Sequence, residues 1–261
     1  MPEPPKPPPA PPSPEVLHDF VQQHATPSHI GQLVRWSDPI CARTAGVDDK
    51  QGAVIVAHID DLARRVGAPV GVPDASGACH PNLAVVVSDK PQAVLDYIKT
   101  RLPVLLGYHY VAQIKRISTV RYPIQAWYVT ATRGASGELI VDDSCCPSPG
   151  GRAGSRFSAD MASEFAAVIV VVDAAVLAAH DLDEMGDYIA VLSLSEADLA
   201  HTCGPLPSVL DDLAAGCPAS RQAATDSDVA FLKGLYSTNP TQFGFMQRAS
   251  IADAMRRAQA R

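Results

Sequence analysis

The chain is poor in aromatic residues and has no excess of basic ones, and the shortage of basic residues limits its partners. Phe, Trp and Tyr make up 6% of its 261 residues. The 21 Lys and Arg residues are outnumbered by 28 Asp and Glu, which gives a formal net charge of -7. No overall positive field therefore attracts a phosphate backbone or an anionic bilayer, and we expect no nucleic-acid partner.

Long hydrophobic runs are also missing. The longest uninterrupted apolar run covers residues 165–172, far short of the roughly 18 residues that cross a bilayer. We expect the protein not to span a membrane. The charged and apolar regions of a signal peptide are missing too, since Met1 leads directly into prolines. The chain is then either cytoplasmic or the mature form of an exported protein.

No catalytic or metal-binding motif is complete. The sequence has no H-E-x-x-H and no C-x-x-C. The glycine-rich segment 150–155 lacks the Lys of a phosphate-binding loop, and segment 134–137 misses the G-x-S-x-G spacing of a hydrolase elbow. We interpret these segments as a loop and a turn. The sequence therefore predicts no catalytic residue, no metal ligand and no cofactor, and leaves open whether the protein is an enzyme.

The six cysteines favour an oxidising compartment. Cys203 and Cys217 enclose a short segment with turn-forming Gly and Pro, and a bridge there would stabilise the fold by about 3 kcal/mol. Cys41 and Cys79 each lie beside an expected strand and form the second expected pair. Free buried thiols in a cytosolic protein are the alternative. The state of the adjacent Cys145-Cys146 stays open.

The remaining composition indicates one globular unit behind an arm. Residues 1–14 contain nine of the 23 prolines, so we expect a disordered, extended arm that acts as a spacer or binds an aromatic groove. With 47% hydrophobic residues, the part 15–261 can bury the core of a single α/β domain. Ser, Pro and Gly predict a mobile loop at 143–158.

Hydrophobic periodicity predicts the order of the elements. Helices are expected near residues 15–20, 55–66, 91–98, 185–192, 229–236 and 251–255. Strands are expected at 33–36, 40–45, 83–87 and 168–172, and antiparallel strands lie between 115 and 142 with a reversal at 132–137. The fold class is α/β (α+β), with a mixed sheet, an antiparallel hairpin region and a helical C-terminal third.

Four short motifs resemble an uncharacterised family of secreted bacterial proteins. They are Leu105-Leu-Gly-Tyr-His-Tyr110, Pro123-Ile-Gln-Ala-Trp-Tyr128, Asp187-Tyr-Ile-Ala-Val-Leu192 and Phe231-Leu-Lys-Gly-Leu-Tyr236. The resemblance implies export and cysteines at positions such as Cys203 and Cys217, and it implies no activity. The segment 168–192 is also faintly similar to secreted proteins of zincin-like fold, whose metal-binding motif this chain lacks.

The densest functional chemistry lies between residues 108 and 128. On strands, alternate side chains share a face, so rings and cationic groups of this segment can line one concave site. Burial of the rings in the core is the alternative. The candidate binding residues are Tyr108, His109, Arg116, Arg121 and Trp127.

Two other candidate sites have simpler explanations. The acidic run of Asp181, Asp183, Glu184 and Asp187 can bind a cation, but acidic residues also favour the first turn of a helix. His24 and His29 can share a metal or lie separately on the surface.

Two functions agree with these observations. The first is a periplasmic or secreted, non-catalytic module that binds a protein or small molecule in the cell envelope. The alternative is a hydrolase, either metal-free or metal-dependent and zincin-like, in which His109 and a distant carboxylate meet only in space. The carboxylate would then orient His109 or bind the metal. A pocket with His109 hydrogen-bonded to a carboxylate would favour the hydrolase.

Overall fold

The computed structural model of the chain describes residues 12–72, 79–142, 159–200, 203–214, 216–217 and 223–259. Most of the expected arm, the expected loop at 143–158 with Cys145 and Cys146, and the glycine-rich segment 150–155 lie outside these residues.

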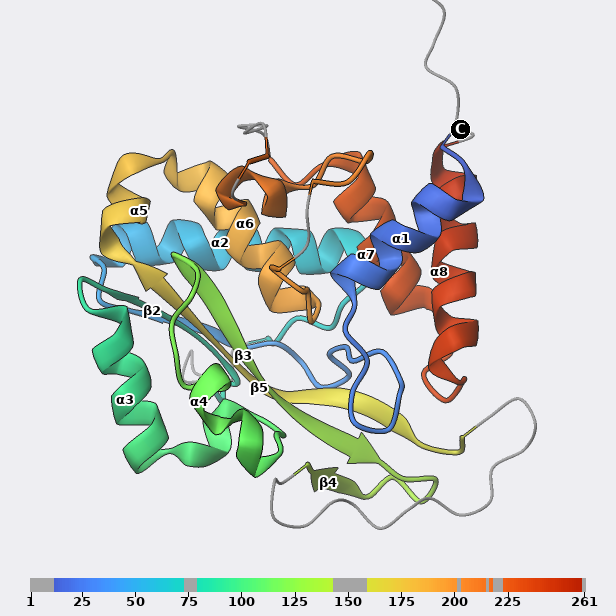
Figure 1. Cartoon of the computed structure of the whole chain (residues 1–261), viewed down its shortest axis with the longest axis horizontal. Coiled ribbons are helices and arrows are strands. Elements are labelled where there is room, and N and C mark those ends of the chain that lie inside the picture. Colours follow the sequence, from blue (N-terminus) through green and yellow to red (C-terminus); the bar gives the residue numbers. More distant parts are fainter. Residues whose placement is uncertain are drawn as a thin grey trace, which may run out of the picture.

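A five-stranded mixed sheet forms the centre of the molecule (Figure 1). Its strands follow the spatial order β1-β2-β5-β3-β4. The bounds are Ala42–Ala45 for β1, Leu83–Ser88 for β2, Ile124–Arg133 for β3, Leu139–Val141 for β4 and Ala162–Asp173 for β5. Strands β1, β2 and β5 are parallel, while β3 runs antiparallel to both β5 and β4. This confirms the predicted mixed sheet and its antiparallel hairpin.

Helices cover the sheet on two sides. In Figure 1 the larger group lies above the sheet and the smaller group below it. The larger group consists of α1 (Pro14–His24), α2 (Asp49–Val66), α5 (Ala174–Ala179), α6 (Leu182–Leu194), α7 (Asp226–Ser237) and α8 (Gly244–Gln259), with a 3-10 turn at Val209–Leu213. The smaller group consists of α3 (Pro91–Arg101) and α4 (Ile114–Ile117), with 3-10 turns at Pro103–Leu106 and Val111–Gln113. The predicted helical C-terminal part is thus confirmed.

Local capping interactions fix several helix ends. Ser13 caps α1 by accepting a hydrogen bond from the amide of Val16 at 3.4 Å. Gly67 ends α2 in the left-handed conformation with a φ of 83°. Thr225 and Asp228 form a capping box at the start of α7.

Two strand predictions were wrong. Segment 33–36 contains only isolated bridges, in which Leu33 pairs with Pro27 and Arg35 with Glu164. Segment 108–121 forms helical turns and loops instead of strands, because the chain turns sharply at Gly107 and then winds into α4. The sheet begins again only at Ile124.

The apolar interior lies on both faces of the sheet. Strand β5 carries the run Val168, Ile169, Val170, Val171 and Val172, all buried, as expected for a strand covered on both faces. Its alternating residues divide between two clusters. The larger cluster contains α1, α2, α6, α7 and α8, and the smaller contains residues of α3, Leu106 and Trp127.

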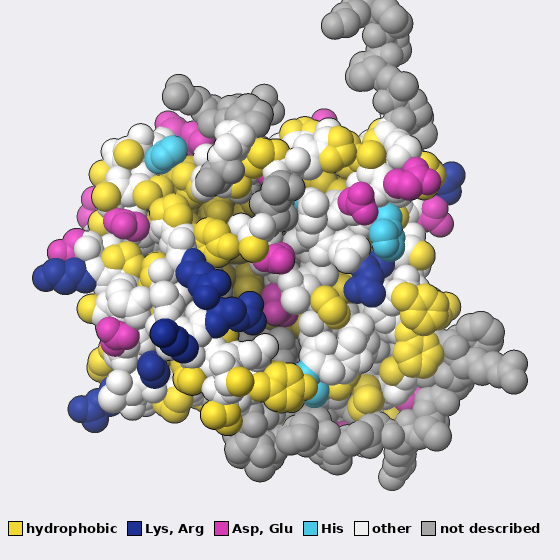
Figure 2. All heavy atoms as spheres, in the orientation of Figure 1, with side chains coloured by type: hydrophobic (Ala, Val, Ile, Leu, Met, Phe, Trp, Pro, Cys, Tyr) yellow, Lys and Arg dark blue, Asp and Glu magenta, His cyan; other side chains and the backbone are white. Residues whose placement is uncertain are grey.

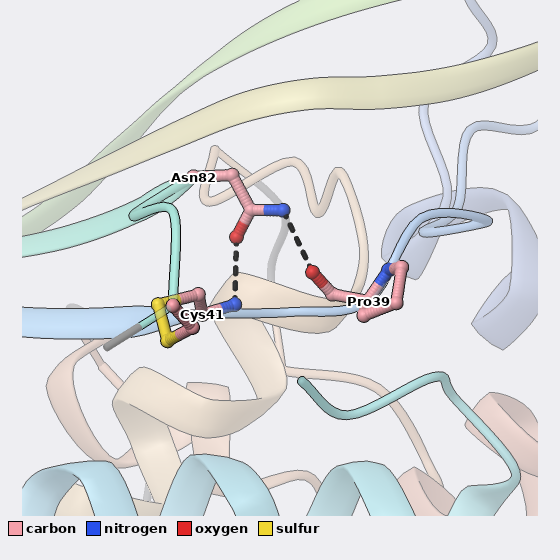
Figure 3. The surroundings of a disulfide bond; sticks show 4 residues. Pro39, Cys41 and Asn82 are labelled. Atoms are coloured by element: carbon pink, nitrogen blue, oxygen red, sulfur yellow. Dashed lines mark hydrogen bonds between the residues drawn. A yellow bond between two sulfur atoms is a disulfide. The ribbon is translucent and has the colours of Figure 1, made fainter. Parts of the chain in front are cut away.

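Two disulfides close segments of the chain. Cys41 is bonded to Cys79 and Cys203 to Cys217, the two expected pairs. Near the first bridge, the Asn82 side chain accepts from the amide of Cys41 at 2.8 Å and donates to the carbonyl of Pro39 at 3.0 Å (Figure 3). Asn82 therefore fixes the chain before β1 to the start of β2.

Within the described ranges, none of the helices is both long and apolar enough to cross a membrane.

Candidate functional site

A pocket of about 440 Å³ opens beside the first half of β3, on the side where no described strand pairs with it. All five candidate binding residues from the sequence line it. Those residues are Tyr108, His109, Arg116, Arg121 and Trp127. The structure thus brings together residues that we had placed on strands, although only Trp127 is on one.

The floor of the pocket is the open part of β3. Strand β4 pairs only with residues 131–133, so residues 124–129 pair with β5 on one side alone. Pro123 accepts a hydrogen bond from the amide of Asp173 on β5 at 2.8 Å. Backbone N–H and C=O groups alternate in direction along a strand. The open side therefore receives the backbone groups of Ile124, Ala126 and Tyr128.

One wall of the pocket is the segment 106–122, which folds over the open edge. Gly107 has a φ of 73°, and a Cβ built on it would lie 2.0 Å from the carbonyl oxygen of Tyr128. Only glycine fits both the conformation and the contact. Farther along, Trp127 donates from its indole nitrogen to the carbonyl of Ile117 at 2.7 Å, which anchors α4 over β3.

This wall carries two guanidinium groups. Arg116 lies on α4 and Arg121 lies on the turn that leads into β3, and both side chains are exposed. The Gln125 side chain holds the turn by accepting from the amide of Arg121 at 2.8 Å. Among the residues that the structure describes, neither guanidinium has a hydrogen-bond or ion-pair partner. The pocket therefore presents two cations that nothing in the described chain neutralises.

The opposite wall is formed by residues 26–29 and 196–200. Glu196 and Asp198 give it acidic side chains. Figure 2 shows Lys and Arg side chains on one side of a hollow and acidic side chains on the other. The pocket is thus electrically asymmetric across its width.

Glu196 is placed by the firmly held end of α6. The last four carbonyls of a helix have no partner within it, and here side chains satisfy all of them. The donors are Ser195 to Val191 at 3.2 Å, Tyr128 to Leu192 at 2.8 Å, Trp36 to Ser193 at 2.9 Å and Tyr236 to Leu194 at 2.9 Å. Ser195 directly follows α6, and the other three donors come from β3, α7 and the chain between α1 and β1. The start of this wall is therefore fixed to the core.

The carboxyl group of Glu196 is shielded from water. Its Oε2 atom is buried without a hydrogen-bond partner, although the side chain as a whole is half-buried. Burial raises the pKa of Glu196 to about 8. At neutral pH this carboxyl is mostly protonated and does not repel an anion in the pocket.

Aromatic rings also line the pocket. His29 stacks on Tyr108 with ring centroids 4.6 Å apart, and Tyr110 meets Tyr108 edge-on at 5.7 Å. Nδ1 of His29 lies 3.4 Å from a carboxylate oxygen of Asp142. The exposed guanidiniums and this ring cluster give the pocket a cationic part and an apolar part.

The other sequence candidates take structural places. Asp181 caps α6, while Asp183 and Asp187 contact the ring of His58 at 3.1 and 2.8 Å. His24 and His29 do not share a site, because His24 is buried against Phe20. Within the described residues, no three Asp, Glu, His or Cys side chains are grouped to hold a metal.

A buried Ser-His-Asp set is not a catalytic triad. Ser208 contacts Nε2 of His24 at 3.0 Å and donates to Asp228 at 2.7 Å. The serine therefore lies between the other two, whereas a hydrolase needs the histidine in the middle. All three side chains are buried, and we interpret them as a polar link between α1 and α7.

Sequence reasoning missed Gln125, Glu196 and the loop 26–29 as parts of the pocket. Glu196 is separated from the 108–128 segment by more than sixty positions, and no local pattern joins the two. Gln125 was visible beside Trp127, but its role depends on the turn at Arg121. Comparison of the chain with protein-family models, with curated proteins and with solved structures found no match.

Proposed function

We propose that the protein is an exported, non-catalytic binding module that takes a ligand with a carboxylate and an apolar part in the pocket beside β3. The observation that carries the proposal is the convergence of Arg116 and Arg121, both without partners among the described residues, on a pocket with aromatic rings. A guanidinium is a forked donor that matches a carboxylate. The rings provide faces for the apolar part.

Export is supported by the two disulfides. Structural disulfides persist mainly outside the cytoplasm, and the Cys41–Cys79 and Cys203–Cys217 bridges are both present. We therefore propose the periplasm or the extracellular space as the location, with a partner or small ligand in the cell envelope.

The surroundings of His109 favour binding over hydrolysis. Its Nδ1 lies 2.8 Å from the carbonyl oxygen of Gly107, so this nitrogen carries the proton and donates. Nδ1 is then engaged by a backbone carbonyl, whereas the familiar triads place a carboxylate at that nitrogen. His109 still provides an imidazole on the pocket wall.

The test uses small aromatic carboxylates as probes. Phenylacetate, N-acetylphenylalanine and N-acetyltyrosine are titrated by calorimetry or NMR, each beside its uncharged amide. We expect saturable binding of at least one acid, and at least about fivefold weaker binding of its amide. Arg116→Ala and Arg121→Ala should each weaken binding of that acid by a similar factor and leave the melting temperature near that of the parent.

Arg65→Ala is the matched control, because Arg65 is exposed at the end of α2 and does not line the pocket. Absence of saturable binding for every acid contradicts the proposal. The proposal is also contradicted if a bound acid has the same affinity for the parent as for Arg116→Ala and Arg121→Ala.

A further inference from the structure

Among the described strands, none pairs with β3 on the pocket side before Thr130, so this edge has the hydrogen-bonding groups of an unpaired strand. Asp142 donates its amide to Thr130 at 2.9 Å, so the edge is occupied at its C-terminal end. Before that point, Ala126 directs both its amide and its carbonyl to the pocket side, as the ladder with β5 requires. Ala126 itself lines the pocket. An unpaired strand edge is a template for an added strand.

Both ends of this free edge are limited by the chain itself. Gly107 lies against the carbonyl of Tyr128, and the turn at Arg121 folds back on Gln125. Residues 124–128 therefore remain, which corresponds to a strand length of roughly 15 Å. This length accommodates about four residues of an extended chain.

The walls of the pocket select the kind of chain that reaches the edge. The segment 106–122 stands on one side, and residues 26–29 and 196–200 stand on the other. The edge strand of a second folded copy would have to enter between these walls together with its own sheet. A free chain end needs only the width of a single strand.

The charges select which chain end is bound. Arg121 lies at the Ile124 end of the open edge, next to Gln125, and the aromatic group of Tyr108 and His29 lines the same pocket. A terminal carboxylate at Arg116 and Arg121 requires the bound chain to end beside Ile124. That chain then runs antiparallel to β3.

We infer, on the basis of the proposed function, that the ligand is the C-terminal end of an extended peptide, which binds as an added antiparallel strand on β3. The backbone of Ala126 pairs with one peptide residue, and the two guanidiniums receive the terminal carboxylate. The remaining peptide side chains alternate between the two walls.

The probe for this inference is a pool of acetylated tetrapeptides with all residues varied except cysteine. The pool is captured on the immobilised protein, and the best-bound sequence is synthesised as free acid, as amide and with an N-methyl group at each backbone amide in turn. We expect N-methylation of alternate amides to weaken binding at least about tenfold and that of the others to have little effect. The amide of Ala126 should exchange with solvent more slowly in the complex, while the amides of Gln125 and Trp127 are protected with or without peptide.

The outcomes separate this inference from the proposed function. Equal tolerance of N-methylation at every position overturns the added strand, and the proposed function stands if N-acetylphenylalanine still needs Arg116 and Arg121. Equal affinity of the amide and the acid overturns the assignment of the carboxylate. Without peptide, sedimentation could show a dimer and hydrogen exchange a protected Ala126 amide. The occupant of the edge would then be a second copy of the chain, which contradicts the inference. No binding by any probe overturns both proposals.

Discussion

Gly107 lies against the carbonyl of Tyr128, and this contact joins the wall segment 106–122 to strand β3. A Cβ at position 107 would approach that carbonyl oxygen to 2.0 Å. The carbonyl belongs to the floor of the pocket and the glycine to its wall. The wall therefore cannot keep its position if residue 107 has a side chain.

Gly107→Ala should be strongly destabilising, by at least about 2 kcal/mol, because the positive φ and the clash both disfavour the native conformation. Gly67→Ala is the control, since Gly67 has a φ of +83° but nothing within 4 Å of a built Cβ. It should cost about 1 kcal/mol. Urea unfolding measures both values, and an equal loss in the two variants would mean that the Tyr128 contact has no effect.

The buried carboxyl of Glu196 should make the protein less stable as the pH rises. Its pKa is about 8 in the folded protein, against 4.5 for an exposed Glu, so between these values the folded state holds a proton that the unfolded state has lost. The free energy of unfolding then falls with pH across this window, with a slope of at most about 1.4 kcal/mol per pH unit.

Glu196→Gln removes this titration. The variant should gain stability relative to the parent as the pH is raised from 4.5 to 8, and urea unfolding at several pH values measures the difference. Asp198→Asn is the control for the loss of one acidic group from the same wall. If the free energies of unfolding of the parent and Glu196→Gln differ by the same amount at every pH, the raised pKa of Glu196 is contradicted.

His58 should titrate above its usual pKa of about 6.5. Burial acts to lower the pKa of His58, but the hydrogen bonds and charges of Asp187 and Asp183 outweigh it and raise the pKa overall. The stabilisation is full below the pKa of the unfolded state and is lost as the pH rises through the pKa of the folded state. NMR titration of the imidazole should give a lower pKa in Asp183→Asn than in the parent, with a small loss of stability because Asp183 is exposed. An unchanged pKa in this variant would show that Asp183 does not stabilise the charged ring.

The two disulfides should contribute unequally. Cys41 and Cys79 are 38 positions apart, and Cys203 and Cys217 are 14 apart. Because closure of a longer loop restricts the unfolded chain more, the double Ser variant of the first pair should lose about 4 kcal/mol and that of the second about 3 kcal/mol. Equilibrium unfolding of both variants gives the comparison. The reverse order would indicate that native-state contacts, such as the bonds of Asn82, decide the contribution.

Elements with strong local signals could be predicted from the sequence. The cap at Ser13, the left-handed Gly67 and the apolar run of β5 depend on neighbouring residues alone. Segment 33–36 could not be assigned this way. Its three apolar residues and Arg35 are all buried, as in a strand, but the segment makes only isolated bridges. Arg35 is held by the carbonyls of Leu235 and Thr238, which are distant in sequence.

The candidate site could be predicted only in part, for a similar reason. The chemical density of 108–128 identified five side chains that do line one pocket, although the expected strand geometry for residues 108–121 was wrong. Trp127 belongs mainly to the core beneath α4. Glu196 depends on how α6 ends, which requires hydrogen bonds from Tyr128, Trp36 and Tyr236.

The most direct test of the account is an NMR titration of the isotopically labelled protein with N-acetylphenylalanine. If the pocket beside β3 is the binding site, the largest shifts of backbone amides occur at residues 107–109, 121–128 and 196–198. These shifts vanish in the Arg116→Ala, Arg121→Ala double variant but persist in Arg65→Ala. Shifts concentrated on another surface, or shifts in the pocket that are unchanged by loss of both guanidiniums, would contradict the claim that this edge of the sheet is the binding site.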